Sequence, residues 1–217
     1  MQSDLAIVIL NYNTCHLLNT YLPSVVKHSN GYRIIFVDNA SKDESVNFVR
    51  ENYPQIEVIC LEENYGFTGG YNRALKQIKA KYYCLLNTDV EVTENWIEPI
   101  INLMEGDEKI AVCQPKLLSY TEKNKFEYAG AAGGFIDYLG YPFCAGRIFD
   151  TIEEDKGQYN EIQEIFWASG AAFFIRSELY HQFGGLDENY FAHFEEIDLC
   201  WRINARGREV AVVPASV

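Results

Sequence analysis

The first half of the chain alternates short apolar runs with segments of helical periodicity. The apolar runs have the length of buried strands, and the segments between them space apolar residues three or four positions apart. A strand–helix–strand crossover is right-handed and makes the two strands parallel. We therefore predict an α/β domain with a parallel sheet and helices on both faces. The strands are predicted at residues 5–10, 33–37, 57–61 and 82–86, and the helices at 15–28, 43–52, 69–79 and 94–104.

Residues 119–166 interrupt this alternation. The segment is rich in Tyr, Phe and Gly and has no clear periodicity. A long irregular insertion in a compact domain is more often functional than neutral, so we expect either a surface that faces a partner or acceptor, or a small antiparallel sheet. Regular patterns then return, with a strand at 171–175, a helix from Ser177, a helix at 195–205 and a strand at 210–213.

Composition excludes several classes of protein. The chain has 217 residues, 48% of them hydrophobic, which is enough for one domain with a real core. A net charge of −13 disfavours binding to nucleic acid. No apolar run reaches the roughly 18–20 residues of a membrane span, and the N-terminus has no signal pattern. Six cysteines without metal-site spacing fit reduced, buried thiols, so we expect a cytoplasmic protein.

Polar side chains follow the predicted strands of the first half. In a parallel α/β sheet, ligands bind beyond the carboxyl ends of the strands. At any single end, Asn, Asp and Ser serve equally well as helix caps or turn residues. Four such ends on one edge of a sheet favour a nucleotide site. The four segments are Asn11-Tyr12-Asn13, Asp38-Asn39-Ala40-Ser41, Asn64-Tyr65-Gly66-Phe67 and Asn87-Thr88-Asp89.

The chemistry of these residues suits a nucleotide. A buried carboxylate such as Asp38 can accept the imide N–H of a pyrimidine, and the Tyr12 ring can stack on the base. Thr68-Gly69-Gly70 precedes a predicted helix, where backbone N–H groups can approach a phosphate. Neither the GxGxxG nor the GxxxxGK[ST] motif is present, which disfavours dinucleotide oxidoreductases and P-loop enzymes.

Two acidic features remain. Asp89 closely follows the strand at 82–86. A carboxylate there is a natural ligand for Mg²⁺ or Mn²⁺ on a diphosphate. The alternative role, a helix N-cap, fits less well because the next predicted helix begins near residue 94. The segment 186–198 holds five carboxylates and neither Lys nor Arg. Within it, Asp198 is spaced for an ion pair with Arg202, and Glu196 is either a general base or a solvated charge at a helix N-terminus.

These motifs, taken in order, resemble glycosyltransferase family 2 and most closely its bacterial rhamnosyltransferase-like branch. The resemblance covers nearly the whole chain. In the first half it is carried by Val8-Ile9-Leu10-Asn11-Tyr12-Asn13, Val37-Asp38-Asn39-Ala40-Ser41, Asn64-Tyr65-Gly66-Phe67-Thr68-Gly69-Gly70-Tyr71-Asn72 and Leu86-Asn87-Thr88-Asp89-Val90. In the second half it is carried by Trp167-Ala168-Ser169-Gly170-Ala171, Gly184-Gly185-Leu186-Asp187-Glu188 and Phe194-Glu195-Glu196-Ile197-Asp198-Leu199-Cys200-Trp201-Arg202.

The resemblance implies a GT-A fold, a Rossmann-like and mostly parallel central sheet flanked by helices, with the Gly- and aromatic-rich insertion on the acceptor side. Residues 1–118 would form the nucleotide-sugar half, and 119–217 the acceptor-binding and catalytic half. In this family Asp38 would hold the base, the turn at 11–13 would line its pocket, and neighbouring residues would border the nucleotide. The implied nucleotide-binding residues are Asn11, Tyr12, Asn13, Asp38, Asn39, Asn64, Gly66, Asn72 and Asn87.

The resemblance also implies the chemistry. Asp89 lies at the position of the family's metal-binding motif and would bind Mn²⁺ or Mg²⁺. The first acidic residue of that motif is replaced here by Asn87. Glu196 stands in the place of the catalytic Asp, with Asp198 as the second choice of base. The family's histidine after a final strand is absent, so we expect a C-terminally truncated chain that binds metal poorly and is inactive as it stands.

The expected function is inverting transfer of a sugar, such as rhamnose, from a UDP, dTDP or GDP donor to a saccharide or lipid-linked saccharide acceptor. Family relatives act in cell-surface polysaccharide synthesis, often at the inner face of the plasma membrane. Three rivals remain: a sugar-nucleotide-binding module without turnover, a nucleotidyltransferase, and a structural scaffold. The stretch 10–18 lacks the Gly-rich basic loop of a nucleotidyltransferase, and a scaffold leaves the acidic segment without a purpose.

Overall fold

The computed structural model describes residues 4–190 and 193–217. The chain forms two compact units, and each is described by itself. The first unit comprises Met1–Val92 and Gly170–Glu195, and the second comprises Thr93–Ser169 and Glu196–Val217. Both units therefore combine segments that are far apart in the sequence.

The first unit contains the predicted parallel sheet. Its strands pair in the order β11-β4-β1-β2-β3, and all pairs are parallel except β11 with β4. Apolar side chains fill β1, β2 and β4 almost completely, because a sheet covered on both faces has no solvent-facing side. The predicted strands are confirmed to within one residue. The bounds are β1 Leu5–Asn11, β2 Arg33–Asp38, β3 Glu57–Cys60, β4 Tyr82–Leu86 and β11 Ala172–Arg176.

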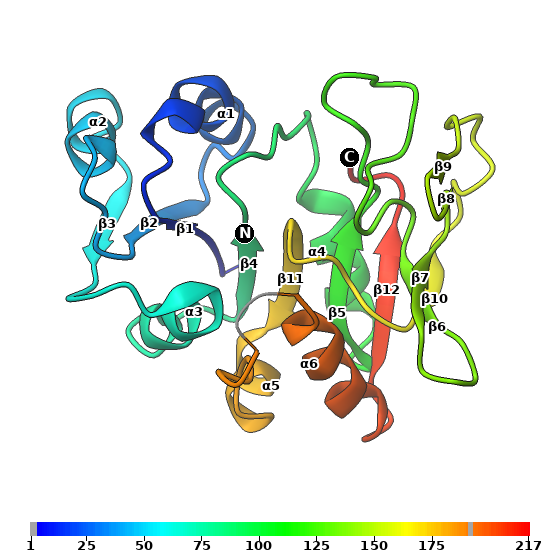
Figure 1. The fold of residues 1–217 in the computed structure, drawn as a ribbon. Helices are drawn as coiled ribbons and strands as arrows, with labels where there is room; N and C mark the ends of the chain where they lie inside the picture. The colour runs from blue at the N-terminus through cyan, green and yellow to red at the C-terminus, as the bar shows by residue number, and fades with distance from the viewer. Residues whose placement is uncertain (1–3, 191–192) are drawn as a thin grey trace. The chain divides into compact units, whose positions relative to one another are not determined.

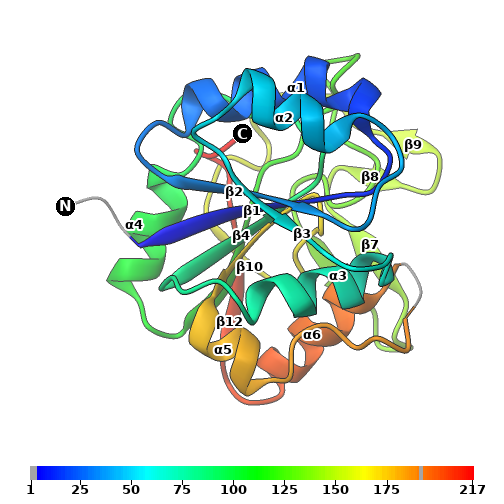
Figure 2. The same cartoon turned by 90° about the vertical axis from the view of Figure 1, so that its left-hand side faces the viewer.

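Helices cover both faces of this sheet, as predicted. Figure 2 shows α1 and α2 on one face and α3 and α5 on the other. Their bounds are α1 Cys15–His28, α2 Ser45–Asn52, α3 Gly66–Leu75 and α5 Ser177–Gln182.

The start of α3 corrects one prediction. The helix begins at Gly66 rather than at residue 69, and both Gly69 and Gly70 are buried inside it. A Cβ atom on Gly70 would lie 2.9 Å from the Leu10 side chain, so this glycine allows α3 to pack closely on β1. The predicted helix start is therefore wrong by three residues, and Thr68, Gly69 and Gly70 lie inside α3 rather than before it.

The second unit is built on three strands and two helices. Its strand β5 was missed by the periodicity, and β12 pairs with it in parallel, while β10 pairs antiparallel with β12. Helix α4 lies beside β5 (Figure 1). It begins four residues later than predicted, because Pro99 fits only the first turn of a helix. The bounds are α4 Glu98–Gly106, β5 Ile110–Pro115, β10 Gln163–Ile165, α6 Glu195–Asn204 and β12 Glu209–Val213.

The insertion at 119–166 holds a four-stranded antiparallel sheet, the second of the two predicted alternatives. Its strands are β6 Gly134–Ile136, β7 Pro142–Cys144, β8 Arg147–Ile148 and β9 Thr151–Ile152. The Trp167 indole anchors this sheet by donating a 2.9 Å hydrogen bond to the carbonyl oxygen of Phe135. A Cβ on Gly134 would lie 2.1 Å from the Trp167 ring, so the strand depends on glycine at that position.

The six cysteines are free thiols, and three of them are buried as predicted. Cys84, Cys113 and Cys200 are buried, whereas Cys15 and Cys144 are half-buried. Cys60 is exposed, contrary to prediction, because it ends β3, which pairs with β2 alone in the first unit. Among the described residues, no helix combines the length and the apolar character that a membrane span requires.

Candidate nucleotide site

The carboxyl ends of β1 and β2 form the centre of the candidate site. Because these strands are parallel and Asn11 lies opposite Asp38, both side chains reach the same edge of the sheet. The Asn11 amide donates hydrogen bonds to Asp38 Oδ1 at 3.1 Å and to Ser41 Oγ at 2.9 Å. The Ser41 backbone N–H donates to Asp38 Oδ2 at 3.0 Å. Asp38 is thus a buried, oriented carboxylate, and each oxygen keeps a second lone pair for a ligand.

The turn after β1 is locked to the loop after β2. Asn13 takes a positive φ of 56°, its N–H donates to Ser41 Oγ at 2.9 Å, and its side chain accepts from the Lys42 N–H at 2.7 Å. Tyr12 stands between these fixed residues and is 42% exposed, so its ring is accessible for stacking.

Asp43 completes this connection. Its carboxylate accepts hydrogen bonds from the Cys15 N–H at 2.9 Å and from Ser45 Oγ at 2.6 Å. Burial alone would raise the pKa of Asp43, but these hydrogen bonds outweigh it and lower the pKa. The acid therefore stays ionised while it holds the starts of α1 and α2.

Asn39 holds the loop after β3 in place. Its side chain is 2% exposed and donates to Asn64 Oδ1 and to the Gly66 carbonyl oxygen, both at 2.9 Å. It also accepts from the Tyr65 N–H at 3.1 Å. Asn39 therefore holds the segment 64–66, which sets Asn64 at the surface and Gly66 at the start of α3 with a φ of +70°.

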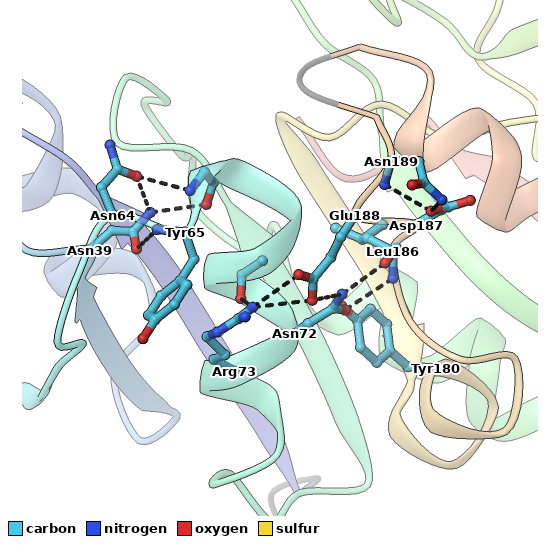
Figure 3. Close-up of polar contacts among 12 residues, drawn as sticks. Asn39, Asn64, Tyr65, Asn72, Arg73, Tyr180, Leu186, Asp187, Glu188 and Asn189 are labelled. Atoms are coloured by element: carbon cyan, nitrogen blue, oxygen red, sulfur yellow. Dashed lines mark hydrogen bonds and ion pairs between the residues drawn. The ribbon is translucent and has the colours of Figure 1, made fainter.

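Asn72 lies in a different environment. Its buried side chain is bonded to Tyr180, Leu186 and Glu188 of the first unit (Figure 3). Its four hydrogen bonds run to these residues and not to the group around Asp38.

The end of β4 presents the predicted metal ligand. The Asn87 N–H donates to the Ala171 carbonyl oxygen at 3.0 Å, Asn87 and Thr88 are half-buried, and Asp89 is exposed. The nearest following helix begins at Glu98, so Asp89 does not cap it. Within residues 4–190 and 193–217, no three His, Cys, Asp or Glu side chains gather around a common point. One carboxylate fits a cation that takes most of its ligands from substrate phosphates and water, as Mg²⁺ commonly does.

The acidic residues of α6 lie in different environments. Asp198 forms the predicted ion pair with Arg202, with an N–O distance of 2.6 Å, so its carboxylate already has a cationic partner. Glu196 is half-buried. Glu195 is 6% exposed, and its Oε2 has no hydrogen-bond partner among the described residues. Burial raises the pKa of Glu195. Glu195 was not among the predicted site residues, because periodicity alone does not reveal burial at a helix start.

A family comparison identifies the chain. The sequence model of "Glycosyl transferase family 2" matches residues 6–183. The chain belongs to glycosyltransferase family 2. The match includes every candidate residue up to Asn87 and Asp89, and it ends before the acidic residues of α6.

The sequence of this family 2 protein is similar to those of two curated glycosyltransferases. It is 22% identical to the low-salt glycan biosynthesis hexosyltransferase Agl10 of Haloferax volcanii, over 93% of this chain and 62% of the relative. It is also 22% identical to an N-acetylglucosaminyl-diphospho-decaprenol L-rhamnosyltransferase of Mycobacterium tuberculosis, over 100% of this chain and 75% of the relative. The second relative agrees with the predicted rhamnosyltransferase-like branch.

Solved structures establish the GT-A fold predicted from the resemblance. GalNAc-T7, solved with UDP, GalNAc and Mn²⁺, gives a TM-score of 0.75 at 16% identity and covers 98% of this chain. The mannosyltransferase PcManGT of Pyrobaculum calidifontis, solved with GDP-Man and Mn²⁺, gives 0.66 at 14% identity over 100% of this chain. The family 2 protein spans 42% and 56% of those two chains.

Proposed function

We propose that this protein is a glycosyltransferase that moves a sugar from a nucleoside diphosphate to an acceptor hydroxyl in glycan synthesis. The observation that carries the proposal is the buried Asp38 carboxylate, held by Asn11 and Ser41 at the carboxyl edge of a parallel sheet. Family membership supports the same activity.

We assign the nucleobase of the donor to the carboxyl edge of the sheet, next to Asp38. Asp38 accepts an N–H of the base, and Tyr12 stacks on its ring. A pyrimidine imide offers one N–H to a carboxylate acceptor. Together with the rhamnosyltransferase relative, which favours dTDP-rhamnose, this leads us to assign the donor as a UDP- or dTDP-sugar. Asn13 and Asn64 border the nucleotide from the two loops that Ser41 and Asn39 hold in place.

A divalent cation, Mn²⁺ or Mg²⁺, would neutralise charge on the diphosphate when bound, with Asp89 as its protein ligand. Mn²⁺ accompanies the nucleotide or sugar nucleotide in two related structures, which supports the assignment. Asn87, two residues before Asp89 in the chain, is half-buried, and its amide can donate a hydrogen bond to a phosphate oxygen.

Glu196 is assigned as the general base. Its carboxylate takes the proton of the acceptor hydroxyl as that oxygen forms a bond to the anomeric carbon. The bond from the anomeric carbon to the diphosphate oxygen breaks in the same step, so the configuration inverts. Asp198 is the weaker candidate, because protonating it would break the ion pair with Arg202.

The acceptor is assigned to the second unit and its insertion. The hairpin of β6 and β7 exposes Tyr138, Tyr141 and Phe143 at 93%, 69% and 52%. Aromatic rings present flat faces that pack against the C–H groups of sugar rings, which suits a saccharide acceptor, free or lipid-linked. We place the transfer on the cytoplasmic side of the plasma membrane, where lipid-linked acceptors are met.

Calorimetric titration tests the donor assignment. UDP, dTDP and GDP are each titrated with and without Mn²⁺ into the wild type and into Asp89→Ala. We expect one pyrimidine nucleotide to bind tightly, and Mn²⁺ to strengthen binding only in the wild type. Binding of no nucleotide by a folded sample contradicts the proposal. Tight binding without sugar transfer to any acceptor or to water supports instead a sugar-nucleotide-binding module.

A further inference from the structure

The Asn72 side chain uses all of its hydrogen-bonding capacity inside the protein. Its Nδ2 donates to the Leu186 carbonyl oxygen at 2.8 Å and to Glu188 Oε1 at 3.2 Å. Its Oδ1 accepts from the Tyr180 hydroxyl at 2.7 Å and from the Leu186 N–H at 3.1 Å. A carboxamide has two donor hydrogens and two acceptor lone pairs, so none remains for a nucleotide.

Arg73, the next residue of α3, reinforces this attachment. Its Nη1 lies 3.1 and 3.2 Å from the two carboxylate oxygens of Glu188. Its guanidinium also lies 3.8 Å from the centroid of the Tyr65 ring, beside Asn64 (Figure 3). The hydrogen bonds from Asn72 and Arg73 lower the pKa of Glu188, which keeps it ionised and unsuited to taking a proton.

The backbone next to Leu186 is shaped to fit this attachment. Gly185 has a φ of +73°, and a Cβ atom there would lie 2.4 Å from Asn72 Oδ1. Only glycine allows the chain to approach Asn72 so closely in that conformation. Gly185 of the Gly184-Gly185 motif therefore has a physical reason in this chain.

We propose that Asn72 and Arg73 are positioning residues that fix the segment 186–188 at the start of the acidic segment, and that Asn72 does not contact the nucleotide. In the sequence this segment leads to Glu195 and Glu196, so we expect its anchoring to affect turnover. The expected effect of these residues on turnover rests on the proposed function, whereas their expected effect on chain mobility does not.

Hydrogen exchange and nucleotide titration on the full chain test the inference. Asn72→Ala is expected to speed amide exchange of residues 186–190 about tenfold or more, without nucleotide present. Arg73→Ala is expected to do so to a smaller extent, and Arg73→Lys, which keeps the charge opposite Glu188, to restore most of the protection. Lys79→Ala, an exposed change just beyond the end of the same helix, serves as the matched control.

Donor affinity and turnover separate the alternatives. We expect Asn72→Ala to keep nucleotide affinity within twofold of the wild type, while kcat for release of the nucleoside diphosphate falls about tenfold with an unchanged KM for the donor. A tenfold loss of affinity with unchanged exchange would overturn the inference and make Asn72 a nucleotide ligand. If Asn72→Ala fails to fold, Arg73→Ala and Arg73→Lys carry the same comparison. If no nucleotide binds the wild type, the proposed function fails, and unchanged exchange in both alanine variants still overturns the inference.

Discussion

Lys116 and Asp155 form a buried ion pair with an N–O distance of 2.6 Å. Only 7% and 14% of these side chains are exposed. Lys116 also donates to Asn160 Oδ1 at 2.8 Å, so its charge is neutralised and solvated by protein groups. Because Lys116 directly follows β5, the pair fastens the insertion to the sheet of the second unit.

Loss of this pair is expected to destabilise the protein in a pH-dependent way. Burial would raise the pKa of Asp155, but hydrogen bonds from Lys116 and the Gly157 N–H outweigh it and place the pKa below its ordinary value of 3.8. The carboxylate therefore contributes stability above that pH, and the contribution is lost as the pH falls through the lowered pKa. Asp155→Asn is expected to cost about 3 kcal/mol in urea denaturation at pH 7, and less below pH 3.8.

The exposed pair of Lys156 with Glu154 is the matched control, with side chains 77% and 51% exposed. Glu154→Gln is expected to change the free energy of unfolding by less than about 0.5 kcal/mol. Equal effects of the two substitutions would contradict the structural role of the buried pair.

Asp38→Asn is expected to weaken binding of the donor nucleotide. The substitution keeps the shape of the side chain but removes a charged hydrogen-bond acceptor, which is worth about 1.5–3 kcal/mol, or roughly 10- to 100-fold in affinity. Calorimetry measures the change, with the exposed Glu62→Gln as control. Unchanged affinity would show that Asp38 does not contact the nucleobase.

Glu196→Gln is expected to lower the rate of transfer by about 10²–10⁴ while leaving donor affinity intact, because it removes only the proton acceptor. Rapid-quench measurement of transfer with saturating donor gives this rate. Glu195→Gln provides the comparison, since Glu195 is the more buried neighbour. A larger loss in Glu195→Gln than in Glu196→Gln would transfer the role of base to Glu195.

Gly70→Ala is expected to destabilise the fold by about 1–3 kcal/mol through overpacking. Its Cβ would lie 2.9 Å from two Leu10 methyl carbons, and 3.1 Å from the Asn39 amide that supports the site. Gly106→Ala, at the end of α4 with no atom within 4 Å, is expected to be neutral or stabilising by up to about 1 kcal/mol. Thermal denaturation of both variants checks this, and similar melting temperatures would contradict the close packing of α3 on β1.

Replacing both Tyr138 and Tyr141 by serine is expected to raise KM for a saccharide acceptor several-fold. Since these rings are 93% and 69% exposed, we expect no change in melting temperature or donor affinity. Initial-rate kinetics with varied acceptor measure the effect. An unchanged acceptor KM would place the acceptor away from this hairpin.

The sequence predicted the sheet of the first unit well because its strands are almost continuous apolar runs. Such runs, separated by helical periodicity, have few alternative interpretations, and β4 was found at Tyr82–Leu86 as predicted. Strand β5 was missed although all of its residues are buried, because Gln114 and Pro115 obscure its apolar pattern. The short strands of the insertion, two or three residues each, carry no periodicity that a sequence can reveal.

The sequence by itself determined the family, the alternation of strands and helices, and the polar residues at the strand ends, because these depend on local order along the chain. Tertiary structure decided which of those residues share a site. It brought Asn11, Asp38 and Ser41 together, and it joined Asn72 to Leu186 across 114 residues instead. The physical reason is that hydrogen-bond capacity is finite, and only the folded chain shows which donors and acceptors are already used.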